Sequence, residues 1–220
     1  MIRVLLADDQ QLIRAGLRML CESTEDIEVV GEASNGRDAV RLAYQLSPDV
    51  ILMDLRMPGL DGVGATREIL RQRPASRVVV LTTFDDDQHL YPAMLAGAFG
   101  FLAKDLSPPQ LISAIRRAAE GDSPFSPAVL RRLLDAALAA RSAPPADTVA
   151  EVPVSARLTD RERQVLELVA AGEPNAVIAE RLNLGITTVK THIANIMTKT
   201  GSRNRIRLAV AAHRHLDDGG

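Results

Sequence analysis

The sequence has little cysteine and few aromatic side chains. Among its 220 residues there is one cysteine, Cys21, and there are no tryptophans, two tyrosines and four phenylalanines. A single cysteine cannot form an internal disulfide, and it lies in an apolar helical pattern, so we expect a small core residue in a reducing compartment. Single-stranded RNA is commonly held by bases that stack on aromatic rings, and the scarcity of such rings argues against RNA as a ligand.

Long apolar runs are missing as well. Every run is far shorter than the ~18 residues that a membrane-spanning helix requires, so we expect no membrane segment. The first residues enter an apolar strand directly, without the basic and then apolar pattern of a secretion signal. Hydrophobic residues make up 46% and charged residues 25% of the chain, which is ordinary for a globular protein. These features together predict a cytoplasmic protein.

Charge is divided unevenly along the chain. Residues 1–120 contain 13 Lys and Arg against 17 Asp and Glu, whereas residues 157–220 contain 10 against 7 and three of the four histidines. An acidic first part suits a metal site, and a basic last part suits a nucleic-acid site. The asymmetry is modest, and it supports both expectations only weakly.

Carboxylates follow two apolar segments that have the pattern of buried strands. Val50–Met53 runs directly into Asp54, and Ile2–Ala7 runs into Asp8 and Asp9. Continuous apolar runs of this length belong to parallel sheets, in which sites form at the carboxyl edge of the strands. Adjacent carboxylates repel one another unless a cation lies between them, and oxygen ligands of this kind suit Mg²⁺. The pattern therefore predicts a magnesium site.

Each of these features has a simpler explanation when it is taken alone. A strand-ending aspartate such as Asp54 can merely cap the next turn, and adjacent aspartates are commonly solvated loop residues. The combination favours a site, because both features stand at the ends of apolar strands.

Two further strand ends carry polar residues. Val78–Leu81 ends in Thr82, and Phe99–Ala103 ends in Lys104. With the segment around Ile27, these strands alternate with helical patterns in five βα units. We therefore expect an α/β fold of flavodoxin-like order, with a five-stranded parallel sheet.

This succession of an acid pair, an aspartate, a threonine and a lysine resembles the receiver domain of two-component response regulators, over residues 1–120. The resemblance implies that Asp54 accepts a phosphoryl group. It implies Mg²⁺ ligands from four residues: Asp8, Asp9, Asp54 and the backbone carbonyl of Arg56. Thr82 and Lys104 would bind the phosphoryl oxygens. Phe101 stands where receivers carry a switch aromatic, although it can also be simply a core residue.

The rest of the chain divides in two. Residues 121–156 hold a Leu- and Ala-rich helical stretch, Pro127–Arg141, and then a tether rich in Ala, Pro and Ser. The pattern of residues 157–220 predicts a small all-α domain. It opens on a capping box at Thr159 and Glu162, and its helices include Ala176–Leu182 and Ile186–Thr200, joined by a tight turn. Two short helices joined in this way indicate a helix-turn-helix.

The motifs of this last domain resemble the LuxR-type DNA-binding domain. They include Leu158-Thr159, Arg161-Glu162, Thr188-Val189-Lys190 and Lys199. A receiver followed by this domain is similar to the NarL/FixJ class of response regulator, with Ile186–Thr200 as recognition helix. By resemblance, the residues that meet the major groove are Lys190, Thr191 and Ala194, and Asn195 projects outward beside them. The residues expected at phosphates or in positioning roles are Thr187, Thr188, His192 and Lys199.

The leading hypothesis is a phosphorylation-dependent transcription regulator. Its partners would be a sensor histidine kinase, promoter DNA, a second copy of the chain after phosphorylation and, as a further candidate, RNA polymerase. One alternative is a DNA-binding regulator whose receiver is not controlled by phosphorylation. Another is a Mg²⁺-dependent phosphatase that forms an aspartyl phosphate. Such enzymes have an aspartate two residues after the nucleophile, where this chain has Arg56, so we expect no enzyme.

Overall fold

The computed structural model describes residues 1–83, 87–125, 129, 158–171, 173, 175–202, 205, 208–209 and 212, except for the side chains of 87 and 88. The chain forms two compact units, Met1–Val129 and Leu130–Gly220, and each is treated by itself. Two expectations fall wholly or largely outside the described residues: the helix of Pro127–Arg141 and the tether that follows it. The domain boundaries at 120 and 156 stay predictions.

The first unit is built on a five-stranded parallel sheet. Its strands are β1 (Ile2–Ala7), β2 (Ile27–Ala33), β3 (Val50–Asp54), β4 (Arg77–Thr82) and β5 (Gly100–Ala103). They lie in the order β2-β1-β3-β4-β5, which confirms the predicted flavodoxin-like fold. All five residues of β3 are buried, because this strand lies at the centre of the sheet and both of its faces are covered.

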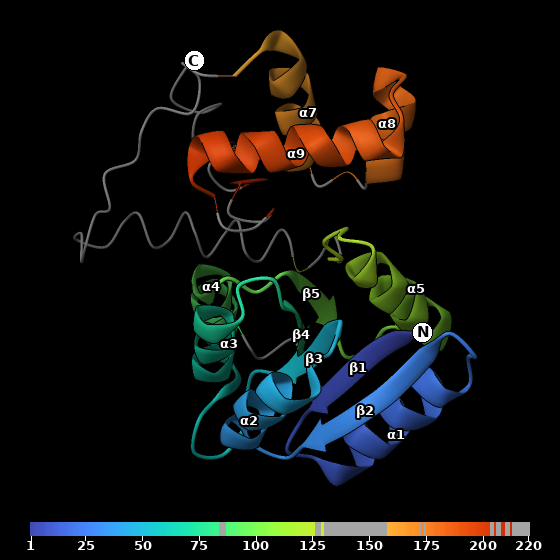
Figure 1. Cartoon of the computed structure of the whole chain (residues 1–220), viewed down its shortest axis with the longest axis vertical. Helices are drawn as coiled ribbons and strands as arrows, with labels where there is room; N and C mark the ends of the chain where they lie inside the picture. Colours follow the sequence, from blue (N-terminus) through green and yellow to red (C-terminus); the bar gives the residue numbers. More distant parts are fainter. Residues whose placement is uncertain are drawn as a thin grey trace, which may run out of the picture. The chain divides into compact units, whose positions relative to one another are not determined.

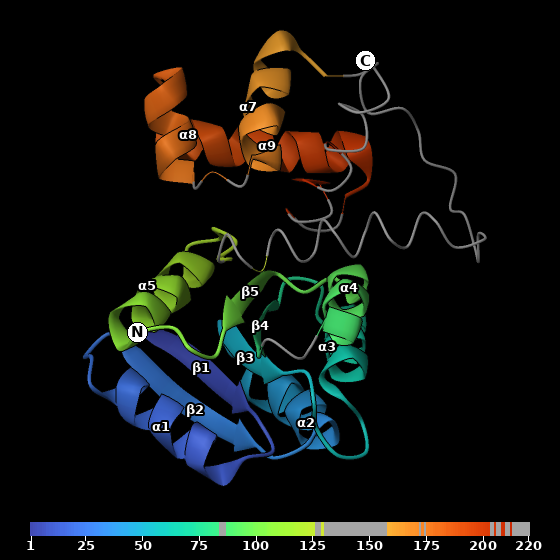
Figure 2. The same cartoon turned by 180° about the vertical axis from the view of Figure 1, so that it is seen from behind.

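Helices cover both faces of this sheet (Figures 1 and 2). One face packs on α1 (Gln11–Glu22) and α5 (Pro108–Ala119), and the other on α2 (Gly36–Leu46), α3 (Gly62–Gln72) and α4 (Asp87–Ala96). Side chains alternate along each strand, so β1 supplies both cores: Val4 and Leu6 belong to one, and Leu5 and Ala7 to the other. Because both faces of the sheet are covered, neighbouring positions along a buried strand are both apolar, and the sequence shows continuous apolar runs.

The start of α2 differs from the sequence expectation by two residues. The sequence predicts a turn at Asn35-Gly36 and a helix from Asp38, whereas the helix begins at Gly36. Asn35 is its N-cap and accepts a hydrogen bond from the backbone N–H of Asp38 at 2.9 Å. The glycine is required here, because a Cβ at Gly36 would lie 2.1 Å from the carbonyl oxygen of Leu60.

Helix α1 has an apolar outer face in addition to its core face. Cys21 is fully buried, as predicted, and burial raises the pKa of its thiol to about 11. Leu12 and Met19 lie on the opposite side of the helix and are 84% and 73% exposed. In the sequence, the residues that recur at helical spacing and predict this helix are Leu12, Ala15, Gly16, Met19 and Leu20. This spacing does not indicate which apolar side chains point away from the sheet.

The described part of the second unit is helical. It contains α7 (Asp160–Ala170), α8 (Asn175–Leu182) and α9 (Ile186–Thr200), which pack on a core that includes Val165, Ile178, Val189, Ile193 and Ile196. This arrangement confirms the predicted helix-turn-helix. The sequence also predicts a fourth helix over residues 206–215. It lies mostly outside the described residues, although Leu208, Ala209 and Ala212 are buried in the same core. Along the described ranges, no helix combines the length and apolar character that crossing a membrane requires.

Candidate functional site

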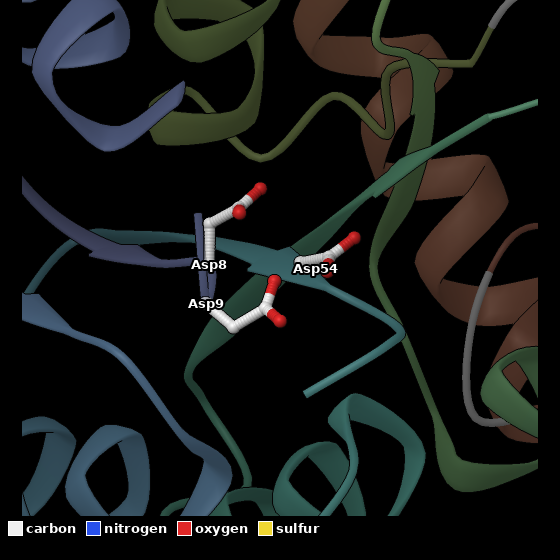
Figure 3. Close-up of side chains that lie close together, drawn as sticks. All are labelled: Asp8, Asp9 and Asp54. Carbon is white, nitrogen blue, oxygen red and sulfur yellow. The ribbon is translucent and has the colours of Figure 1, made fainter. Parts of the chain in front are cut away.

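Three carboxylates gather at the carboxyl edge of the sheet (Figure 3). Strands β1 and β3 pair in register with Ala7 opposite Met53, so Asp8, directly after β1, and Asp54, the last residue of β3, reach the same level. With Asp9, they offer oxygen atoms that all lie within 4.8 Å of one another. Asp8 and Asp54 are buried, whereas Asp9 is exposed. The site is therefore deep on one side and open to solvent on the other.

Lys104 supplies positive charge to this cluster from the end of β5. Its Nζ lies 2.7 Å from Oδ2 of Asp8 and 2.8 Å from Oδ1 of Asp54. Burial by itself would lower the pKa of Lys104, but hydrogen bonds to Asp54 and Asp8 outweigh it and the pKa is raised. Lys104 therefore stays protonated and offsets part of the repulsion between the two buried carboxylates.

Local hydrogen bonds hold Asp8 in place. The backbone N–H of Gln10 donates to Oδ1 of Asp8 at 2.9 Å, and the guanidinium of Arg14 donates to the backbone carbonyl of Asp8 at 2.7 Å. Oδ1 and Oδ2 of Asp8 thus have separate partners, Gln10 and Lys104. Three carboxylates at this spacing fit a hard divalent cation that keeps several waters, and the exposed side at Asp9 gives such waters room. Arg56, whose carbonyl was expected as a further ligand, is exposed on the loop after β3.

Thr82 lies at the same edge of the sheet. It is fully buried, and its backbone carbonyl accepts a hydrogen bond from the backbone N–H of Lys104 at 2.8 Å. Its Oγ1 donates to the carbonyl oxygen of Thr83 at 3.0 Å. Phe101 lies deeper in β5 and is also fully buried. The structure thus brings Thr82, Lys104, Asp8 and Asp54 together and places Phe101 in the core beneath them.

Gly62 is a positioning residue that the sequence reasoning did not single out. Its backbone N–H donates to the carbonyl oxygen of Leu55 at 3.0 Å, so the start of α3 lies directly against the end of β3. A Cβ at Gly62 would be 1.9 Å from the carbonyl oxygen of Asp54, a distance that no side chain could accept. The sequence Asp61-Gly62 could have indicated this role. Asp61 is the N-cap of α3, and the residue after it contacts the end of β3.

The outer face of α9 carries most of the residues predicted to contact DNA. Five of them are exposed: Thr187, Thr188, Thr191, Ala194 and Asn195. Lys190 and His192 are half-buried and lie at the margins of this face. Gly185 occupies the N-cap position of the helix, where it offers no side-chain hydrogen bond to the first turn. These contacts stay predictions, and the exposed face is consistent with them.

Lys199 has a partner within its own unit. Its Nζ lies 2.7 Å from both carboxylate oxygens of Glu162, which is buried at the start of α7. Glu162 also accepts a hydrogen bond from the backbone N–H of Thr159 at 2.8 Å, which completes the predicted capping box. Lys199 therefore joins α9 to α7, which is a positioning role of the kind that the sequence allowed for this residue.

This pair leads to a prediction about stability and pH. The ion pair with Lys199, followed by the hydrogen bonds from Thr159, lowers the pKa of Glu162. Its contribution to stability is then present above the pKa of the unfolded chain and is lost as pH falls through the lower folded pKa. Glu162→Gln should lower the free energy of unfolding by about 1 kcal/mol near neutral pH, because glutamine can still complete the capping box but loses the ion pair with Lys199.

Urea denaturation followed by circular dichroism at several pH values measures this effect. The difference between wild type and Glu162→Gln should shrink in acid. Glu167→Gln is a matched control, because Glu167 lies on the same helix and is exposed. An equal loss in the control, or a difference that does not depend on pH, would contradict the assigned role.

Family models match both parts of the chain. The response regulator receiver domain matches residues 4–116, and the luxR family of bacterial regulatory proteins matches residues 156–212. The chain therefore belongs to the response regulators of two-component systems, in the NarL/LuxR class that joins a receiver domain to a LuxR-type DNA-binding domain.

Individual proteins agree with this assignment over nearly the whole length. The chain is 43% identical to the transcriptional regulatory protein LiaR of Bacillus subtilis over 98% of both chains, and 38% identical to the response regulator VraR of Staphylococcus epidermidis over 97% of both. Among solved structures, the response regulator ChrA of a heme-sensing two-component system matches with a TM-score of 0.54 at 34% identity, covering 98% of both chains. RcsB, solved as two dimers bound to two parallel DNAs, matches with a TM-score of 0.55 at 26% identity, covering 100% of this chain and 99% of that one.

Proposed function

We propose that Asp54 accepts a phosphoryl group from a sensor histidine kinase and that this event controls DNA binding at promoters. The observation that carries the proposal is the convergence of Asp8, Asp9 and Asp54 on one point, with the Lys104 ammonium within 2.8 Å of two of them. Phosphoryl transfer depends mainly on positioning and on neutralisation of spreading negative charge. This cluster has the groups for both tasks.

Each residue has a distinct part in the proposal. Asp8, Asp9, Asp54 and the carbonyl of Arg56 would hold Mg²⁺, which would supply positive charge to the site when bound. Lys104 exchanges its ion pair with Asp54 for the phosphoryl group and keeps its contact with Asp8. The Thr82 hydroxyl turns from the Thr83 carbonyl toward the new oxygens. A phosphoryl group carries roughly −1.5 to −2 charge at pH 7, enough to bias a local element between two states. Phe101, which lies in the core beneath Thr82 and Lys104, would respond to their movement as the switch aromatic.

The second unit supplies DNA binding in this proposal. Lys190, Thr191 and Ala194 meet base edges in the major groove, with Asn195 beside them. The residues proposed to contact the phosphate backbone or to position the recognition helix are Thr187, Thr188, His192 and Lys199. After phosphorylation, two copies of the chain form a dimer that binds two half-sites on one DNA duplex. We further propose that the protein works in the cytoplasm, has RNA polymerase as a further partner at its promoters and has no catalytic activity of its own beyond accepting the phosphoryl group.

Two observations weigh against the alternatives. A receiver that is never phosphorylated needs no compensated pair of buried carboxylates, yet Asp8 and Asp54 are both buried around Lys104. An aspartyl-phosphate phosphatase needs an acid two residues after the nucleophile, and Arg56 stands there. The comparisons likewise lead to DNA-binding regulators.

Genome-wide DNA occupancy tests the proposed function as a whole. We expect Asp54→Asn to remove most signal-dependent occupancy, because the switch is lost while the recognition helix is intact. Lys190→Ala should reduce sequence-specific occupancy under every condition, because a good bidentate base contact is worth about 1–3 kcal/mol. Occupancy that is unchanged in Asp54→Asn would show a regulator that does not depend on phosphorylation, the first alternative.

A further inference from the structure

A row of methyl-bearing side chains runs along the outer face of α9. Its members are spaced by three and four residues, so that they share one side of the helix: Thr191, Ala194 and Thr198. All three are exposed, and they lie opposite the buried Val189, Ile193 and Ile196. None of them carries a formal charge, although the helix is the proposed DNA-reading element.

The hydroxyl groups of this row are directed to the backbone of the helix itself. Oγ1 of Thr191 donates to the carbonyl oxygen of Thr187 at 3.0 Å, and Oγ1 of Thr198 donates to the carbonyl oxygen of Ala194 at 3.0 Å. A threonine has one hydroxyl hydrogen, so these two donors are in use. The methyl groups of Thr191 and Thr198 then stand beside the methyl of Ala194 on the exposed surface.

We infer that this row, called here the methyl row (Thr191, Ala194 and Thr198), selects thymine-containing operators by contact with thymine methyl groups. The inference rests on the proposed function of α9 in the major groove. In that groove only thymine presents a methyl group, at C5, whereas the other three bases present donors and acceptors alone. A surface of methyl groups whose hydroxyl donors are already used packs best against that feature.

Lys190 and Asn195 flank the methyl row and supply the hydrogen-bond donors that it lacks. Lys190 is half-buried on one side and Asn195 is exposed on the other. The half-site then combines a polar contact at each margin with thymines beneath the row. Direct readout by the row itself is apolar, so its contribution depends on methyl groups and not on hydrogen bonding.

Removal of single methyl groups from the DNA tests the inference. A binding site is selected from a random duplex library with the full-length protein treated with a small phosphodonor and Mg²⁺. Each thymine of the site is then replaced in turn by deoxyuridine, which keeps base pairing and lacks only the methyl group. We expect about threefold to fivefold weaker binding at each thymine beneath the row, the size that burial of one methyl group implies.

Two matched variants identify which atoms of the protein read that methyl group. Thr191→Ser keeps the hydroxyl and removes the methyl, so it should bind about threefold to fivefold more weakly and lose its sensitivity to uracil at one position. Thr191→Val keeps a methyl of the same shape and removes the hydroxyl, so it should retain affinity and sensitivity. Both variants should show the circular dichroism spectrum of the wild type.

The possible failures are distinct. If no sequence is enriched from the library, the proposed DNA-binding function fails and the inference fails with it. If a site is enriched but uracil changes nothing at any position, the inference alone is overturned. Weak binding by Thr191→Val together with full binding by Thr191→Ser would also overturn it, because the hydroxyl would then be the reading group.

Discussion

Replacing Asp54 with asparagine is expected to abolish phosphate incorporation from a small phosphodonor, and removal of Mg²⁺ is expected to do the same to the wild-type protein. Asparagine keeps the shape of the side chain but has no carboxylate oxygen with which to attack phosphorus. Lys104 contacts two carboxylates, those of Asp8 and Asp54, and the substitution leaves only Asp8. The loss should be complete, because the change removes the nucleophile itself.

Intact mass spectrometry after incubation with the phosphodonor measures this result. Asp26→Asn is a matched control, because Asp26 is a partly exposed carboxylate that pairs with Arg116 and precedes β2, at the opposite edge of the sheet from Asp54. The control should incorporate phosphate as the wild type does. Phosphate recovered on Asp54→Asn at the wild-type level, or incorporation by the wild type in excess chelator, would contradict the assigned site.

Phosphorylation of Asp54 is expected to raise affinity for an operator by roughly 5–150-fold, the range that a coupling of 1–3 kcal/mol allows. We expect part of this gain to come from dimers, because two linked recognition helices would bind two half-sites with a raised effective concentration. We expect the other part to come from release of the second unit. Residues 1–120 are net acidic and residues 157–220 are net basic, so attraction between them can mask Lys190 before phosphorylation.

Three forms of the protein separate these contributions. They are the full-length protein before phosphorylation, the same protein after it, and a fragment of residues 157–220 shown by circular dichroism to be helical. On one operator at fixed salt, the fragment should bind more tightly than the unphosphorylated protein. At high concentration it should approach the phosphorylated protein. Equal affinity of the full-length protein before and after phosphorylation, with no advantage for the fragment, would show that Asp54 controls something other than DNA affinity.

Much of this molecule follows from short-range signals in the sequence. Helix α9 runs from Ile186 to Thr200 as predicted, because Gly185 and the left-handed Gly201 mark its two ends. The carboxylates of the candidate site were found from chain position alone, because parallel strands bring their carboxyl ends to one edge of the sheet. In both cases the deciding information lies within a few residues of the feature.

Contacts between distant residues were decided only by the tertiary structure. Lys104 meets Asp8 across 96 residues, and Lys199 meets Glu162 across 37. No local pattern specifies such a pair, because it depends on how whole elements pack. The same holds for the exposed Leu12, whose direction depends on which side of α1 the sheet occupies. The sequence thus determined the elements, the strand-end acids and the class of protein. Packing decided which charges meet and which apolar side chains remain exposed, because these depend on atoms that only the folded chain brings together.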